Sequence, residues 1–567
     1  MKKLIALLLA LVMVFALCAC GGSKTETPAP AASGSSSSGS SVGSSSSSGS
    51  SNSGSSGSSG GSSTPAAPES TALPEQGTGE YTPSDETLVV ANKGNPTTLC
   101  HLTATAVSAN NATLSSMYDR LVDYDYENNT VVPMLAESWE RVDDTHVRFH
   151  LRKDVVSHAG DPFTASDVIF TVTNGQEGGM LSNYYGMFDL PECKAEDDYT
   201  VVLASKTPDP FFLYTLSNTP LAMIVEASTK KDGLEAQALN PTAATGPYKF
   251  VEWNDGSYVK LERNENYWGK TPYYKNVEIR IITDASARVM NLESHDINIA
   301  LDPDVNSMLA LEGNPDFTIV DLPTTNITTI FMNCSKEPFT DVNLRRAIAC
   351  AINYDANLKV AVGSRGKITD TNLPVNSVMY KSQPDSLYHY NVDKAKEYLA
   401  ASNYPNGLTI DLLYAENPIF GKYAEMVQEQ LNQIGITLTL TPIASKEFDA
   451  RISAGDFQME MINASNPDPS IQMKYYDGRI DFKANRGGCG FVDAPQELLD
   501  LIDQAKVTID DAKRLEIFDQ LQKMLCDLCP AIPVYSPNKM CVMDSDILGV
   551  TLTEFCDINW SKAYKAN

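Results

Sequence analysis

The chain has 567 residues and a formal net charge of −28 at pH 7, from 71 acidic and 43 basic side chains. This acidity argues against nucleic acids and other phosphate-rich partners, because clustered lysines and arginines are what hold phosphate groups. It is typical of a soluble surface, and the length is enough for several domain-sized units with a large buried core.

The N-terminus has the features of a secretion signal that ends at an attachment point. Two lysines precede an apolar stretch over residues 4–17, which is too short to span a bilayer as a mature helix. A leucine lies three residues before Cys20 and small Ala19 directly precedes it, which resembles the bacterial lipobox, whose cysteine is diacylated. The rival Cys18 follows a bulky leucine, and an ordinary secretory signal with an incidental cysteine is the other alternative. We expect residues 1–19 to be removed and Cys20 to carry the lipid anchor.

Residues 20–83 are almost wholly serine, glycine, threonine, proline and alanine. Such a composition cannot bury enough apolar surface to offset the entropy of ordering, so we expect a disordered tether. About sixty residues of this kind have a root-mean-square span of roughly 40–45 Å, which suits a domain held away from a membrane or through a wall. We expect the protein on the extracellular face of the cell membrane of a bacterium of the Gram-positive type.

The first half of the folded part shows strand patterns. Strands are predicted over residues 86–91 and 276–282, as a pair within 139–151, and as a hairpin within 246–262 that turns over Asn-Asp-Gly. Apolar and polar residues alternate over residues 146–151, which gives one buried and one wet face. Two histidines share the wet face, but no cysteine or carboxylate of that strand completes a metal site.

The second half adds helices with clear start signals. Asp341 and Asn391 are positioned to cap two helices, the second ending near Ala401. A helix over residues 422–434 leads into a strand over 436–440. Two helical segments follow within residues 495–525, before a strand over 531–535. This alternation of helices and strands predicts the α/β class.

Catalytic motifs are missing from the sequence. It contains no zinc-protease, phosphate-binding-loop or dinucleotide fingerprint, and only 6 histidines. Ser364-x-x-Lys367 lacks the second motif of serine acyl-transferases, and a G-x-S-x-G match at residues 57–61 lies in low-complexity sequence. We therefore expect no enzyme, no catalytic residue, no metal and no cofactor.

Cysteines do not form the framework of this protein. Of the 11 cysteines, Cys18 leaves with the signal and Cys20 is acylated, so nine remain and at least one is unpaired within the chain. Their scattered spacing is unlike that of a disulfide scaffold. Cys526-x-x-Cys529 has no second cysteine pair or nearby histidine, which favours packing at a helix end over a redox or zinc site.

Several stretches resemble the family 5 extracellular solute-binding proteins, the peptide and nickel receptors of ABC importers. The likeness covers nearly all of residues 86–564, in the expected order. The stretches that carry it are 132–140 (VPMLAESWE), 149–154 (FHLRKD), 161–168 (DPFTASDV), 245–248 (TGPY), 262–264, 267–268, 338–347 (PFTDVNLRRA) and 429–436 (EQLNQIGI).

The resemblance implies an α/β fold of the periplasmic-binding-protein type, with two lobes and an extra subdomain. The first lobe would comprise residues 84–323 and 531–567, with the subdomain at 110–220. Residues 324–530 would form the second lobe, and the two crossings between the lobes would act as the hinge.

The resemblance also implies where the ligand binds. In the peptide receptors, a stretch like Gly455-Asp456-Phe457-Gln458 leads through a tryptophan to an aspartate that holds the α-ammonium group of the peptide. Here Ile462 stands in place of the tryptophan and Ser465 in place of the aspartate. A serine hydroxyl cannot equal a charge-assisted hydrogen bond, so the dipeptide recognition of the known receptors is in doubt.

We expect ligand-binding residues on both lobes. On the second lobe they are Ile462, Asn463, Ser465 and Asn466, with a hydrogen-bonded loop that does not contact ligand as the alternative. On the subdomain, Tyr184 or Tyr185 resembles the tyrosine that reaches the ligand in peptide receptors.

The expected function is that of a membrane-tethered monomeric receptor, which closes its lobes on a small solute and hands it to an ABC transporter permease. A peptide is the favoured solute, and a sugar, an opine or a metal complex are the alternatives. A peptide-sensing receptor is a further possibility. The missing motifs argue against a surface hydrolase.

Overall fold

The computed structural model describes residues 80–103, 111–125, 130–177, 182–363, 365–465, 468–552 and 558–565. The chain divides into two units, Met1–Ala67 and Pro68–Asn567, and every described residue belongs to the second. The predicted signal, Cys20 and all but the last four residues of the predicted tether lie outside the described residues. Within the described part of the chain, no helix has the length and apolar character needed to cross a bilayer.

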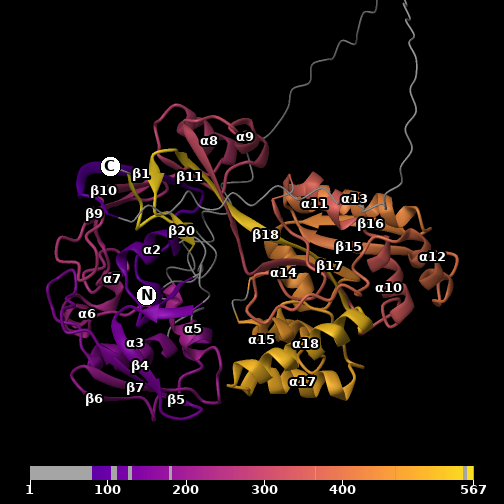
Figure 1. Ribbon diagram of the computed structural model, residues 1–567, viewed down its shortest axis with the longest axis horizontal. Helices are drawn as coiled ribbons and strands as arrows, with labels where there is room; N and C mark the ends of the chain where they lie inside the picture. Colours follow the sequence, from indigo (N-terminus) through magenta and orange to yellow (C-terminus); the bar gives the residue numbers. More distant parts are fainter. Residues whose placement is uncertain are drawn as a thin grey trace, which may run out of the picture. The chain divides into compact units, whose positions relative to one another are not determined.

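The first lobe, which contains β1, β9, β10 and β11 in Figure 1, is built on a mixed sheet whose strands follow the order β8-β9-β10-β1-β11. Strands β1, β10 and β11 are parallel, whereas β9 runs antiparallel to both of its neighbours, β8 and β10. Alternate residues of β1 pack into different cores, Leu88 and Val90 on one face and Ala91 on the other. The elements are β1 (Ser84–Asn92), α2 (Asn111–Met117), α6 (Glu226–Asp232), α7 (Leu234–Gln237), β8 (Tyr248–Asn254), β9 (Tyr258–Arg263), β10 (Tyr274–Ile281), α8 (Ala285–Glu293), β11 (Ile299–Leu301), α9 (Val305–Ala310) and β12 (Phe317–Pro323).

A separate four-stranded antiparallel sheet, in the order β4-β5-β7-β6, forms the subdomain of this lobe. The predicted alternation is confirmed, since Val147, Phe149 and Leu151 of β5 are buried while His150 is exposed. The elements are β2 (Val122–Asp125), β3 (Thr130–Pro133), β4 (Ala136–Arg141), β5 (His146–Leu151), α3 (Ala165–Glu177), α4 (Ser182–Tyr185), β6 (Lys194–Asp197), β7 (Thr200–Ala204) and α5 (Phe212–Leu216), with short 3₁₀ helices at His101–Thr103 and Thr219–Leu221.

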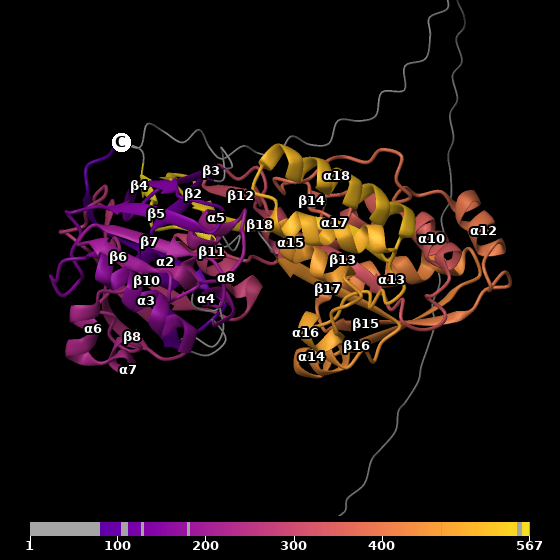
Figure 2. The ribbon, with the colours of Figure 1, turned by 90° about the horizontal axis from the view of Figure 1, so that it is seen from below.

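The second lobe continues the sheet in the order β16-β15-β17-β13. Strands β15 and β16 are parallel and joined by α13, and α17 packs along α18 (Figure 2). The elements are β13 (Asn326–Met332), α10 (Val342–Ala351), α11 (Tyr354–Val362), β14 (Gly366–Lys367), α12 (Val392–Ala400), β15 (Thr409–Ala415), α13 (Pro418–Asn432), β16 (Thr437–Ile443), α14 (Ser445–Ser453), β17 (Met459–Ser465), α15 (Pro469–Gln472), the 3₁₀ helix η3 (Met473–Tyr476), α16 (Phe482–Asn485), α17 (Gln496–Val507) and α18 (Asp511–Leu528).

One long strand, β18 (Ala531–Asp544), belongs to both lobes (Figure 1). It pairs with β13 over Ala531–Tyr535 and with β12 from Asn538 onward. The change of partners coincides with the other crossing of the chain, where the Thr324 hydroxyl donates to the Pro537 carbonyl at 2.6 Å. Both crossings therefore lie next to each other. Short strands complete the first lobe: β19 (Ile547–Leu548), β20 (Thr551–Leu552), β21 (Ile558–Asn559) and β22 (Tyr564–Lys565).

Most predicted elements are confirmed, and the differences have local causes. The side chains of Asp341 and Asn391 accept hydrogen bonds from the first turns of α10 and α12. Helix α13 begins before the predicted residue 422, because Asn417 caps it and Pro418 occupies its first position. The predicted strand over 531–535 extends to Asp544, since its second half packs into the cores of the first lobe.

The eight described cysteines are all buried thiols. Cys526 lies in the last turn of α18 and Cys529 ends that helix in a left-handed conformation. Burial raises the pKa of both thiols. The described residues contain no group of three or more metal-binding side chains suited to hold an ion. Both thiols are packed in the hydrophobic core at the end of α18.

Candidate ligand-binding site

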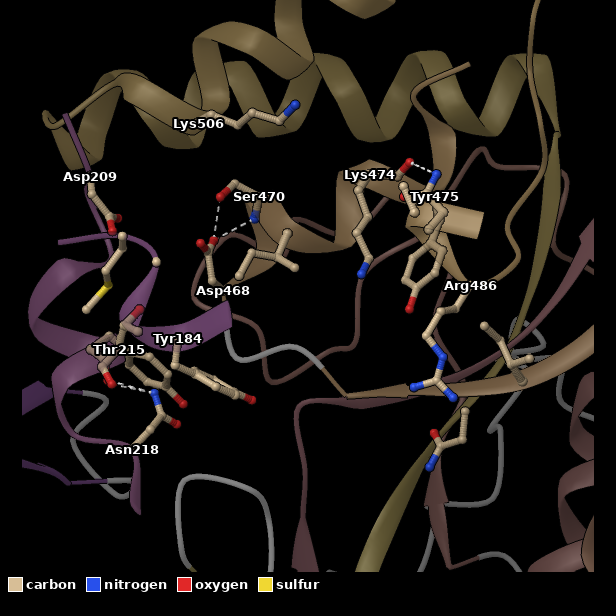
Figure 3. Close-up of a pocket in the computed structure, with 18 of the residues that line it drawn as sticks. Tyr184, Asp209, Thr215, Asn218, Asp468, Ser470, Lys474, Tyr475, Arg486 and Lys506 are labelled. Carbon is tan, nitrogen blue, oxygen red and sulfur yellow. Dashed lines mark hydrogen bonds between the residues drawn. The ribbon is translucent and has the colours of Figure 1, made fainter. Parts of the chain in front are cut away.

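A cavity of about 1040 Å³ lies where the subdomain of the first lobe faces the second lobe (Figure 3). This volume is at the upper end of the range of small-molecule sites. The first-lobe lining is Tyr184, Gly186, Met187, Ser205, Lys206, Thr207, Pro208, Asp209, Tyr214, Thr215 and Asn218. The second-lobe lining is Ala415, Phe420, Ser445, Phe448, Asp449, Ile452, Met461, Ile462, Asn463, Asp468, Ser470, Ile471, Lys474, Tyr475, Ala484, Asn485, Arg486 and Lys506.

The first-lobe wall presents uncharged polar groups and two charged side chains. Asn218, just after α5, donates to the Thr215 carbonyl at 2.8 Å, and its buried Oδ1 has no hydrogen-bond partner among the described residues. Lys206 is satisfied locally, since its Nζ donates to the Gly186 carbonyl at 2.8 Å. Asp209 accepts from the Phe211 amide at 2.8 Å, and burial raises the pKa of its carboxyl.

The second-lobe wall is organised by β17 and the segment after it. Asp468 caps α15, because its Oδ1 accepts from the amide and the hydroxyl of Ser470 at 2.7 and 2.6 Å. Helix η3 then carries Lys474 and Tyr475 to the cavity. Arg486 ends α16 in a left-handed conformation with φ of 55°, and the two glycines that follow it also have positive φ. Lys474, Tyr475 and Arg486 lie on the same side of the cavity, with the Tyr475 ring drawn between the two cations (Figure 3).

Two carboxyl groups make one end of the cavity acidic. Burial and the nearby Asp209 raise the pKa of the Asp468 carboxyl to about 7, against hydrogen bonds from Ser470 and the charge of Arg514. Arg514 of α18 lies over the ring of Phe211 at 4.3 Å and ion-pairs with Asp511 at 2.6 Å. The acidic end therefore joins both lobes, with one arginine as a shared neighbour.

Three cations lie on the second-lobe side. Lys506 ion-pairs with Asp477 at 3.5 Å and Asp503 at 3.9 Å. Arg486 contacts Asp449 at 3.0 Å. Lys474 has no carboxylate within ion-pair distance among the described residues, and burial together with the charge of Arg486 lowers its pKa. The cavity thus has opposite charges at two ends.

The family of this protein follows from its sequence. The model of the bacterial extracellular solute-binding proteins, family 5 (middle region), matches residues 130–481, which is more than half of the chain. The chain belongs to this family. The two lobes around a cavity are the architecture that the resemblance implied, and the family assignment made from the sequence is confirmed.

Similar proteins differ in the ligands that their names report. The dipeptide-binding protein of Escherichia coli K12 is 27% identical over 479 residues, covering 79% of this chain and 88% of that protein. The oligopeptide-binding protein AppA of Bacillus subtilis, solved with a nonapeptide, has 25% identity and a TM-score of 0.68, covering 86% of this chain and 100% of that one. NikA of Brucella suis, solved with Fe(III)-EDTA, has 22% identity and a TM-score of 0.74, with 85% and 100% covered.

The predicted site residues of this solute-binding protein differ in whether they line the cavity. Tyr184, Ile462 and Asn463 line the cavity. Tyr185 does not: its ring is fully buried and its hydroxyl donates to the Pro220 carbonyl at 2.7 Å.

The other two predicted residues, Ser465 and Asn466, lie at the gap in the described residues between positions 465 and 468. The backbone of Ser465 ends β17 opposite Asn326. Asn466 lies outside the described residues. The importance of these residues for ligand binding therefore stays a prediction.

Sequence reasoning missed the charged residues of the solute-binding cavity. Asp468 and Arg486 follow recognisable local patterns, an Asp-Pro helix start and an Arg-Gly-Gly turn, but neither pattern says what the side chain faces. Asp209 comes from a different lobe, so its proximity to Asp468 depends on the tertiary fold.

Proposed function

We propose that this family 5 solute-binding protein captures a peptide between its lobes and delivers it to an ABC transporter permease. The observation that carries the proposal is the cavity with opposite charges at two ends, because a peptide is a zwitterion. A ligand that contacts both lobes stabilises the closed arrangement, since only there does it make both sets of contacts. The sequence similarity to peptide-binding proteins supports the same reading.

The ammonium end of the peptide binds at Asp468 in this proposal. Ser465 stands where the known receptors have their aspartate, and Asp468 supplies a carboxylate three residues further along the chain. Its Oδ1 is engaged by Ser470, while no hydrogen bond to Oδ2 is formed by the described residues. An ammonium group offers the charge-assisted hydrogen bond that this carboxylate lacks.

The protein acts by binding and without covalent chemistry in this proposal. The described residues that line the cavity include no histidine and no cysteine, which are frequent bases and nucleophiles. Purified protein is expected to leave a peptide library intact over hours. If the wild-type protein produced cleavage products and the Asp468→Asn, Lys474→Met double variant did not, the hydrolase alternative would be supported.

Native mass spectrometry of the purified protein tests the nature of the solute. We expect co-purified masses whose fragmentation gives peptide ladders, and thermal stabilisation by synthetic peptides but not by sugars, opines or metal chelates. Small-angle scattering is expected to show a smaller radius of gyration with peptide bound. Co-purification of a non-peptide solute alone would contradict the proposal.

We also propose that Cys20 anchors the protein to the outer face of the membrane, through a tether that ends near residue 83. A Cys20→Ala variant is expected to appear in the culture medium with unchanged peptide affinity, because the cavity lies in the folded part. A variant that stays in the membrane fraction would show that the attachment point lies elsewhere. Transport assays in cells that lack the cognate ABC transporter permease distinguish import from sensing.

A further inference from the structure

Lys474 and Arg486 form a second polar feature of the cavity, away from Asp468. Both side chains line the same side of the cavity, Lys474 from η3 and Arg486 from the turn after α16, with Tyr475 between them in the view (Figure 3). The charge of Arg486 is close enough to Lys474 to disfavour its protonation. Two like charges held together cost free energy unless an anion lies between them.

The surrounding chain holds these two cations in place. The Asn485 side chain donates to the Lys474 carbonyl at 2.8 Å, which joins the residue before Arg486 to the backbone of Lys474. The Cys489 amide donates to the Tyr475 carbonyl at 3.0 Å. On the other side of the turn, the Gly488 amide donates to Oε1 of buried Glu460 at 2.6 Å. The pair is therefore a built arrangement of the second lobe.

The pair is only partly neutralised by the protein. Asp449 contacts Arg486 at 3.0 Å, but both side chains are about half or more exposed, so water screens this contact. Lys474 interacts with the face of the Tyr475 ring at 5.0 Å and has no carboxylate partner within the described part of the chain. Lys506, in the same lining, is by contrast paired with two carboxylates.

We propose that Lys474 and Arg486 are the carboxylate-binding residues of this cavity and make the protein selective for ligands with a carboxylate at this end. The proposal rests on the proposed function, and it narrows the substrate class to peptides with a free C-terminus or an acidic side chain. Arg486 can bind a carboxylate with two parallel hydrogen bonds, while Lys474 contributes a point charge.

Three matched peptide libraries separate the two sources of the carboxylate. Each has random sequences of two to eight residues: one with free C-termini and no Asp or Glu, one with amidated C-termini and no Asp or Glu, and one amidated with a single Glu. Peptides retained after equilibrium dialysis are quantified by mass spectrometry. Retention of the first library points to the α-carboxylate, and retention of the third to an acidic side chain.

Two outcomes of this experiment overturn the inference in different ways. Equal retention of all three libraries leaves the peptide receptor standing and removes the carboxylate site. Retention of none contradicts the peptide receptor itself, and the inference falls with it.

Substitutions then assign the preference to the two cations. Lys474→Met and Arg486→Gln are each expected to weaken binding of the preferred library about tenfold to a hundredfold, the usual worth of a charged hydrogen bond, and to reduce its advantage over the neutral amides. Lys506→Met removes the same charge from the same lining, but its lysine is already paired, so the preference is expected to persist. If Lys474→Met and Arg486→Gln both kept the wild-type preference for carboxylates and the wild-type thermal midpoint, other residues would be responsible for the carboxylate selectivity.

Discussion

The two charged ends of the cavity are assembled differently. The acidic end takes Asp209 from the first lobe and Asp468 from the second, and the charge of Asp209 helps to raise the pKa of Asp468. The basic end takes Lys474 and Arg486 from the second lobe alone, joined through Asn485. The acidic end therefore depends on how the lobes meet, whereas the basic end exists within one lobe.

This difference suggests an order of events. A carboxylate can dock on the second lobe while the lobes are apart, because both of its cationic partners are already in place. Closure then brings two carboxyl groups together, which is unfavourable unless a cation lies near them. In the proposed function, a ligand ammonium group adds a cation beside Arg514 at this end, so the ligand would shift the lobes toward the closed state through its own charge.

The largest expected effect concerns Glu460, which supports the turn that carries Arg486. Burial raises the pKa of this carboxyl to about 8, compared with about 4.3 in an unfolded chain. The folded protein therefore retains a proton that the unfolded chain releases, so this contribution to stability is present below pH 4 and is lost as the pH rises to 8. We expect the free energy of unfolding to fall by a few kilocalories per mole over this interval, because one pKa unit corresponds to about 1.4 kcal/mol.

The comparison with Glu460→Gln isolates this carboxyl, since glutamine resembles the protonated form and can still accept from the Gly488 amide. Urea denaturation at pH 5 and pH 8.5 is expected to show a smaller loss of stability in the variant than in the wild type. Lys474→Met serves as control, because it leaves Glu460 in place. Equal pH dependence of wild type and Glu460→Gln would contradict the buried, protonated state.

Asp468→Asn tests the acidic end directly. The carboxyl of Asp468 has a pKa raised to about 7 by burial and by Asp209, so it ionises as the pH rises through 7. Peptide affinity is expected to increase from pH 6 to pH 7.5 and to decrease above about pH 8, where the peptide amine itself loses its proton. Calorimetric titration of the Asp468→Asn variant is expected to show a tenfold to hundredfold loss at pH 7.5 and no increase between pH 6 and 7.5.

A matched control for this end is Asp449→Asn, which removes a carboxylate from the same cavity at the basic side. Its peptide affinity is expected to keep the increase with pH. If Asp468→Asn retained that increase, the ammonium group would bind elsewhere, and the side chain of Ser465 would be the next candidate.

The sequence could predict what depends on neighbouring residues. The caps at Asp341 and Asn391 and the alternation in β5 are set within a few residues, and they fold as expected. The length of β18 could not be predicted, because its second half is stabilised by β11 and β12, more than 200 residues earlier in the chain.

The same distinction between local sequence and tertiary packing applies to the candidate site. The resemblance in sequence predicted Ile462 and Asn463 as ligand-binding residues, and both line the cavity. The proximity of Asp209 to Asp468 depends on how the two lobes pack, and that of Lys474 to Arg486 depends on the turns of the second lobe. Sequence alone could not decide whether Tyr184 or Tyr185 lines the cavity. That depends on the direction of each side chain, and the directions of neighbouring residues in a helix differ by about 100°.

The smallest effect is expected at Arg514, the cation that the two lobes share at the acidic end. It lies over Phe211 of the first lobe, and its charge favours ionisation of both Asp209 and Asp468. Arg514→Met keeps much of the packing against Phe211 and removes the charge, so the closed state loses a stabilising cation that a ligand ammonium only partly replaces. We expect peptide affinity to fall severalfold, mainly because more of the protein is open without ligand. Small-angle scattering of the ligand-free protein measures this open population.

Because Asp511 pairs with Arg514 on the exposed side of α18, Asp511→Asn is the control that leaves the contact between the lobes intact. An Arg514→Met variant with wild-type scattering and weakened affinity would show that Arg514 acts on the ligand and not on closure.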